Sequence, residues 1–151
     1  MSHTMRVVVF LFAALFSLSA HAAALIESLS GSVRTGPSAA AATAASQNQR
    51  LLPGAVVTTG AKSQTVLRFD DGQAIALGEN TEFKVTAYSF ARERPANDSF
   101  VFELLRGALR SVTGLVGQRN PQAYVLRAPQ ATIGIRGTDF MVAVVNPAFL
   151  S

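Results

Sequence analysis

The sequence predicts an all-β domain, because its apolar residues alternate with a period of two and do not follow the 3.6-residue period of a helix. In residues 65–69, Leu67 and Phe69 point to one face of the expected strand and Arg68 points to the other. Turn residues interrupt such segments about every ten residues, which is typical of sandwiches and barrels. We therefore expect a single domain of short antiparallel-type strands that form a sandwich, a rolled barrel or a short β-helix-like sheet.

The best-defined element is a hairpin over residues 64–78. Asp70, Asp71 and Gly72 interrupt the alternation, and glycine tolerates the positive φ that tight turns require. Further strands are expected at residues 83–88, 100–105, 124–127, 131–135 and 140–145. Gly107 is expected to close the strand at 100–105.

Three segments without strand periodicity are expected to be loops. Residues 37–46 form a low-complexity run of small, uncharged residues, which favours an insertion loop between two strands, with room for a frayed helical turn. Residues 92–99 are polar and contain proline, so they favour a loop. Residues 114–122 show no clear periodicity and are expected to form a long turn.

The N-terminus has the pattern of a secretory signal peptide over residues 1–22. Arg6 precedes an apolar run at residues 7–18, and Ala20-His21-Ala22 fits the A-x-A cleavage pattern. The apolar run is shorter than the roughly 20 residues of a membrane-spanning helix, although an uncleaved anchor stays open as the alternative. We therefore expect a signal-peptide helix that is cleaved near Ala22 to Ala24. Residues 23–151 then form one domain in the periplasm or outside the cell, with membrane contact only during export.

Removal of this leader would restrict the chemistry of the remaining domain. His3 and His21 are the two histidines, and the chain contains no cysteine. Thiol catalysis, serine-histidine triads and histidine zinc sites are thereby excluded, and no cofactor or metal is predicted. After the loss of Arg6, 12 Lys and Arg residues face 9 Asp and Glu residues. This mild, scattered excess does not indicate a nucleic-acid partner, which requires clustered positive charge.

The acidic and nucleophilic residues give little support to an enzyme. Asp70 and Asp71 are adjacent, so on extended backbone their carboxylates point to opposite faces and do not converge on a substrate. Lys62-Ser63 on a turn, and Lys84 as another base, are poor candidates for a Ser/Lys dyad. Carboxylates at the short alternating spacing of a calcium loop are also missing from the sequence.

Residues 132–140, TIGIRGTDF, contain an I-G-x-x-G pattern that is compatible with three structures. A KH nucleic-acid clamp needs flanking helices, but a proline precedes the segment and a β-branched run follows it. A phosphate-binding nest around Arg136 would normally open a helix, and none is expected here. The third structure is a strand, a turn and a second strand, in which Gly137 allows positive φ or a bulge. Arg136 then covers a sheet edge or pairs with a carboxylate such as Asp139.

Several segments together resemble the FecR domain, and they occur in the order of that family. They are GSVR (31–34), LPGA (52–55), TTG (58–60), VLRFDDG (66–72), LLRGALR (104–110) and APQATIGIRGTDF (128–140). The resemblance covers residues 25–145 and implies an all-β, extracytoplasmic module without catalytic activity. In the signalling members of this family, the domain transmits the occupancy of an outer-membrane transporter to a cytoplasmic sigma factor.

The sequence departs from the signalling members at both ends. Six residues precede the apolar run, which is too short for a cytoplasmic anti-sigma segment, so the chain resembles the exported FecR-domain proteins, some of which are joined to cell-wall-binding modules. The chain stops six residues after the last expected strand, where the family usually continues into further strands. We expect either a partner that covers the resulting open edge or a C-terminal end that is incomplete.

These observations predict a non-enzymatic envelope module that binds another, unidentified envelope protein and is linked to cell-surface signal transduction. The alternative is a module that binds peptidoglycan or another glycan, with Tyr88 and Tyr124 as stacking platforms; an envelope hydrolase is the third candidate. The motif residues are expected to act structurally, as turns, bulges, core or local hydrogen bonds. They are Gly60, Asp71, Gly72, Gly107, Gly134, Arg136, Gly137, Thr138 and Phe140.

Overall fold

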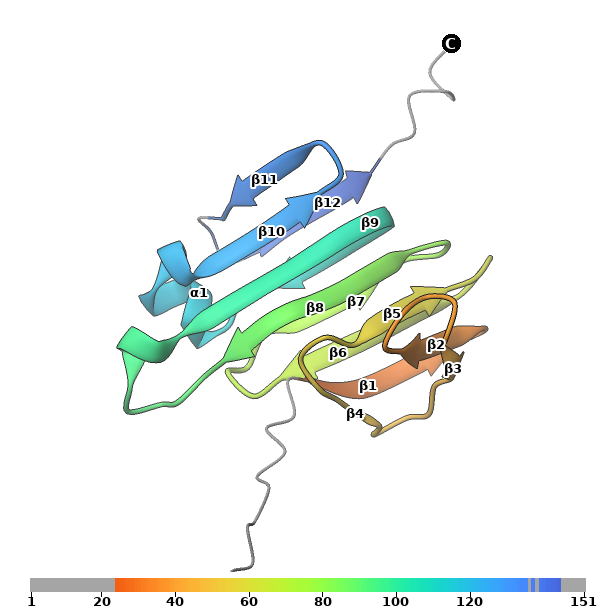
Figure 1. Ribbon diagram of the computed structural model, residues 1–151, viewed down its shortest axis with the longest axis horizontal. Coiled ribbons are helices and arrows are strands. Elements are labelled where there is room, and N and C mark those ends of the chain that lie inside the picture. Colours follow the sequence, from red (N-terminus) through yellow and green to blue (C-terminus); the bar gives the residue numbers. More distant parts are fainter. Residues whose placement is uncertain (1–23, 136, 138, 145–151) are drawn as a thin grey trace, which may run out of the picture.

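The computed structural model describes residues 24–135, 137 and 139–144, which form a single curled sheet with the shape of a half-barrel (Figure 1). The prediction of a single all-β domain is confirmed, and of the three expected architectures the rolled barrel is the nearest. The strands are β1 (Ala24–Ser30), β2 (Val33–Gly36), β3 (Thr43–Ala44), β4 (Arg50–Leu51), β5 (Val56–Thr59), β6 (Gln64–Phe69), β7 (Ala74–Leu77), β8 (Glu82–Ser89), β9 (Ser99–Val112), β10 (Tyr124–Ala128), β11 (Ala131–Gly134) and β12 (Asp139–Val144).

The long strand β9 belongs to both layers of the half-barrel. Its first half lies between β8, which is antiparallel, and β10, which is parallel. Its second half lies between β7 and β12, both antiparallel. In Figure 1, β7 and β12 accordingly lie behind β8 and β10. The expectation of antiparallel-type strands therefore holds for every pair that the structure describes except β9 and β10.

A bulge at Leu105, two residues before Gly107, allows β9 to pass from one layer to the other. Phe100, Phe102 and Leu104 point inward before the bulge, whereas Leu109 and Ser111 point inward after it. An extra residue has been absorbed between the two series, as the register shift against β8 also shows.

The sequence prediction that Gly107 closes the strand is wrong. At Gly107 φ is +85°, and a Cβ there would lie 2.5 Å from the Cα of Thr81. Glycine is required because it accepts this φ and this close approach, and the strand bends without ending.

The hairpin of residues 64–78 forms as predicted, with β6 and β7 joined by a turn in which φ of Gly72 is +91°. Its alternation places Leu67, Phe69, Ile75 and Leu77 in the core, opposite the inward phenylalanines of β8 and β9. Fully burying each such side chain contributes about 1.5–3 kcal/mol, so this local pattern also contributes to stability.

All three predicted loops contain short secondary structure. Residues 37–46 include β3, which pairs with β2, and a single hydrogen-bonded turn in which the amide of Ala42 donates to the carbonyl of Ala39. The expected long turn at 114–122 contains the helix α1 (Leu115–Arg119) and the start of the 3-10 helix η2 (Pro121–Ala123). The polar segment 92–99 is a loop that contains the 3-10 helix η1 (Pro95–Asn97). Tertiary contacts stabilise these short helices, because a single turn has little stability of its own.

No helix within the described residues is long and apolar enough to cross a membrane. The predicted signal peptide and the C-terminal residues 145–151 lie outside the described residues.

Candidate functional site

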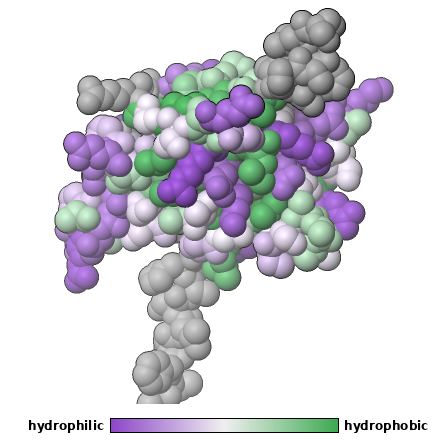
Figure 2. Space-filling model, turned by 45° about the horizontal axis from the view of Figure 1, so that its top comes forward, coloured by the Kyte–Doolittle hydropathy of each residue, from purple (hydrophilic) through white to green (hydrophobic). Residues whose placement is uncertain are grey.

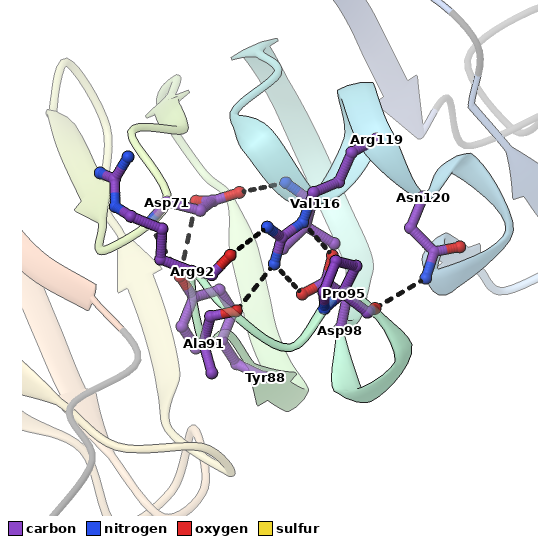
Figure 3. A network of polar contacts seen from close by, with 9 residues as sticks. All are labelled: Asp71, Tyr88, Ala91, Arg92, Pro95, Asp98, Val116, Arg119 and Asn120. Atoms are coloured by element: carbon purple, nitrogen blue, oxygen red, sulfur yellow. Dashed lines mark hydrogen bonds and ion pairs between the residues drawn. The ribbon is translucent and has the colours of Figure 1, made fainter.

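The loop between β8 and β9, residues 90–98, is exposed and charged, and a network of polar contacts fixes its position. Residues 91–97 are all exposed and include Arg92, Glu93 and Arg94. The loop lies against α1 at one end of the half-barrel (Figure 3). Loops that a rigid scaffold positions often carry binding residues, so this end of the molecule is the candidate site.

The guanidinium of Arg119, at the C-terminal end of α1, fixes this loop. It donates two hydrogen bonds of 2.7 Å to the Asp98 carboxylate, one to each oxygen (Figure 3). It donates two more to the backbone carbonyls of Ala91 (2.9 Å) and Arg92 (2.7 Å). The Asp98 side chain is fully buried, and its pairing with Arg119 raises the pKa of the guanidinium. Bidentate pairs of this kind fix orientation as well as distance.

Two further contacts hold the loop. The Asn120 amide donates a hydrogen bond of 3.2 Å to the carbonyl of Pro95. The Arg119 guanidinium also lies over the Phe90 ring, 5.2 Å from its centroid. The loop backbone is therefore preorganised, while Glu93 and Arg94 are exposed.

Asp71 anchors α1 from the hairpin turn beneath the loop. Its Oδ2 accepts a hydrogen bond of 3.1 Å from the Val116 amide, and its carbonyl accepts one of 3.0 Å from the Leu115 amide. Gly114 stands at the N-cap position and supplies no capping side chain, so Asp71 takes that role from a distant part of the chain. A Cβ on Gly114 would lie 2.6 Å from Oδ2 of Asp71, so only glycine allows this approach.

Burial dominates the electrostatics of Asp71. Desolvation raises the pKa of its carboxyl group, and hydrogen bonds from the amides of Val116 and Gln73 and from the Tyr88 hydroxyl oppose this rise. The adjacent Asp70 is exposed. The two carboxylates therefore do not converge, as expected for neighbours at a strand end.

A cleft of about 240 Å³ lies beside the loop, and it mixes aromatic, charged and amide groups. It is lined by Asp70, Tyr88, Ser89, Phe90, Ala91, Arg94 and Asn97. Pockets for drug-sized ligands usually measure about 300–1,000 Å³, so this cleft is smaller than such a pocket.

The two tyrosines that we considered as stacking platforms for sugars pack inside the domain and form hydrogen bonds there. Tyr124 is fully buried, and its hydroxyl lies among Gln73 and Ser111. The half-buried Tyr88 packs edge-on against Phe100 and accepts a hydrogen bond from the Asp71 amide. The structure therefore contradicts Tyr124 as a stacking platform, because its ring has no face open to solvent.

The sequence-predicted motif residues do not gather at one place. Asp71 and Gly72 form the hairpin turn beneath the loop. Gly60 follows β5, where its amide donates a hydrogen bond of 3.0 Å to the carbonyl of Ser32, and Gly107 follows the bulge of β9. Asp71 is the member of this set that reaches the candidate site.

The remaining motif residues lie near β11 and β12. Gly134 is exposed at the end of β11 with open space around it, whereas Gly137 has a φ of +140°. Phe140 is half-buried and packs against the core. Arg136 and Thr138 lie outside the described residues, so their proposed local bonding stays a prediction. Arg110 pairs bidentately with Asp139, the carboxylate that we considered as a partner for Arg136, with the shorter contact at 2.6 Å.

Sequence reasoning missed the pair of Asp98 and Arg119. Both residues lie in segments without periodicity, 21 positions apart. Their opposite charges are the only signal, and this signal does not distinguish them from other charged residues of the two segments.

The half-barrel and the loop that Arg119 fixes define an all-β domain with an exposed charged loop at one end. The model of the FecR protein family matches residues 55–148, more than half of the chain, so the chain belongs to the FecR family. The match begins after the GSVR segment and includes most of the other segments that suggested this family. A search of curated proteins found no match, and neither did a search of solved structures.

Proposed function

We propose that this FecR-type module works without catalysis in the cell envelope, in the periplasm or outside the cell, and binds another envelope protein. FecR proteins form a signalling and regulatory family, and this membership motivates the proposal. The preorganised loop 90–98 carries it, because an exposed charged segment with a fixed backbone loses little entropy on binding.

The charges of the loop indicate the chemistry of the partner. Arg92 and Arg94 flank Glu93, so the exposed residues 91–97 carry a net charge of +1, while Asp98 is buried and paired with Arg119. Arginine is enriched at protein interfaces, and its charge would favour an acidic surface patch on the partner. The neighbouring cleft, with Tyr88 and Asn97, can accept a side chain from that patch.

The contacts of the residues considered for catalysis are consistent with this proposal. The Asp71 carboxylate is occupied by backbone amides and caps α1. The Ser63 hydroxyl donates a hydrogen bond to the carbonyl of Ala61 and accepts one from the amide of Ser32, so it stabilises the turn that precedes β6. These contacts support a structural role for Asp71 and Ser63.

An affinity capture with matched variants tests this function. The 151-residue chain is expressed with a C-terminal tag, the purified product is immobilised, and the envelope fraction of the source cells is passed over it. We expect one protein to be retained by the unaltered chain and lost when Arg92→Ala and Arg94→Ala are combined. Arg127→Ala removes one exposed arginine from β10, outside the loop, and should retain this protein.

The proposal is overturned if no protein is retained above background or if the three baits retain the same proteins equally. Retention of peptidoglycan in place of protein would favour the glycan-binding alternative.

A further inference from the structure

The strand β12 is the longest open edge in the described part of the half-barrel. It pairs with β9 over six residues, and no other described strand lies on its outer side. The other edge strands are shorter, with two residues in β3, two in β4 and four in β11.

This edge lacks the features that usually prevent sheets from associating. No charged residue, proline or glycine occurs between Phe140 and Val144. Asp139, at the start of the strand, is paired with Arg110 at 2.6 Å, so its charge is locally compensated. Natural proteins normally protect edges with charges, prolines or bulges, so a regular uncharged edge favours pairing with another strand.

Both faces of β12 carry apolar side chains. Phe140, Val142 and Val144 are half-buried against the core. On the outer face, Met141 is 76% exposed, and Val112 of the neighbouring strand is 47% exposed. Figure 2, with the side that carries β10, β11 and β12 turned forward, shows hydrophobic surface between polar side chains.

We propose that β12 pairs antiparallel with β12 of a second copy of this chain, about a two-fold axis that passes beside Val142. This contact goes beyond the proposed function, because it uses a different surface and a different partner from the loop 90–98. The two copies would extend one layer of the half-barrel into a continuous sheet.

The sequence of β12 is complementary to itself in this register. A two-fold axis perpendicular to the sheet keeps each face on its own side, so opposing residues must have the same parity. Val142 then lies opposite Val142, Phe140 opposite Val144, and the large Met141 opposite the small Ala143. The Asp139 carboxylates stay outside the paired residues, at opposite ends, so no like charges face each other.

The neighbouring register, with its axis beside Met141, is less favourable. It places two methionines opposite each other. It also draws Asp139 into the paired stretch, where its charge would lose water. We therefore assign the register at Val142.

A charge-swap experiment tests the pairing. Met141 and Ala143 are both exposed, so lysine or glutamate at these positions should be compatible with the folded monomer. Sedimentation equilibrium of the purified chain should show a mass that rises from monomer toward dimer with concentration. Combining Met141→Lys with Ala143→Lys places like charges opposite each other and should give a monomer. Combining Met141→Lys with Ala143→Glu places opposite charges in register and should restore the dimer.

Single-cysteine variants test the register, because the natural chain has no cysteine. Opposing residues of antiparallel strands have Cα atoms about 4.5–5.5 Å apart, a distance that a disulfide spans, whereas diagonal neighbours are about 7–8 Å apart. Under mild oxidation, Val142→Cys should give a covalent dimer faster than Met141→Cys, although Met141 is the more exposed position. Random collisions would give the reverse order.

Three results would overturn the proposal. They are a monomeric mass at every concentration up to about 1 mM, a dimer that persists when both lysines are present, and faster cross-linking through Met141→Cys.

Discussion

The Asp71 carboxylate accepts a hydrogen bond of 3.1 Å from the amide of Val116, a residue 45 positions further along the chain. This contact joins the hairpin turn to the first turn of α1, and α1 in turn holds the loop 90–98 through Arg119 (Figure 3). The candidate site thus depends on a buried carboxylate that takes the place of the N-cap side chain that α1 lacks.

Removal of this carboxylate should destabilise the domain. Asp71→Ala leaves the buried amides of Val116 and Gln73 without their acceptor, and a buried unsatisfied donor costs about 1–3 kcal/mol. Urea denaturation should show a lower free energy of unfolding with an unchanged slope. An unaltered midpoint would show that water replaces the carboxylate without loss.

The same residue predicts a pH dependence. Burial raises the pKa of Asp71 above its ordinary value of 3.8, so the folded state binds this proton more tightly than the unfolded state. The stability due to this group therefore increases as the pH falls through the folded pKa and is complete below 3.8. The free energy of unfolding of the natural chain, minus that of Asp71→Ala, should rise as the pH is lowered from about 7 to about 4. A difference that falls as the pH is lowered would contradict a raised pKa of Asp71.

Gly107→Ala should be more harmful than Gly72→Ala. Both glycines have positive φ, +85° and +91°, which costs other residues about 1–3 kcal/mol. A Cβ at Gly107 would also lie 2.5 Å from the Cα of Thr81, whereas at Gly72 the space is open. Thermal unfolding should show the larger decrease in Tm for Gly107→Ala. Equal decreases would show that the backbone at Gly107 adjusts without strain.

Replacement of Arg119 should loosen the loop 90–98 and leave the sheet intact. Arg119→Gln removes the ion pair to the buried Asp98 and weakens the bonds to the carbonyls of Ala91 and Arg92. Amide hydrogen exchange should accelerate in residues 91–98 and stay unchanged in β6 and β7. Arg119→Lys keeps the charge without the two-pronged geometry and should give an intermediate rate. Unchanged exchange in both variants would contradict the clamp.

Gly137→Val should destabilise the domain by about 1–3 kcal/mol, because φ of Gly137 is +140° and valine is strained there. Gly134→Val is the matched control, since Gly134 has no positive φ and a Cβ there would meet open space. The prediction concerns the difference in Tm between the two variants. Equal values would show that the backbone at Gly137 does not require glycine.

Local pattern predicted the parts of the fold that are held together by residues near each other in the chain. The hairpin of β6 and β7 is the clearest case, because alternation decides which side chains are buried and Gly72 allows the turn. The same alternation predicted β8 and the first half of β9. These features depend on a period of two and on turn residues, which are properties of short segments.

Contacts between distant residues decided the rest. The continuation of β9 beyond Gly107 depends on partner strands on both sides, β7 and β12, that no local pattern identifies. The helix α1 depends on a cap from Asp71, and the loop 90–98 depends on a pair between Asp98 and Arg119. The sequence by itself determined an all-β chain, its family segments and its glycine turns. Only the tertiary structure decided the bend, the capped helix and the fixed loop, because their stabilising partners are 21 to 45 residues away.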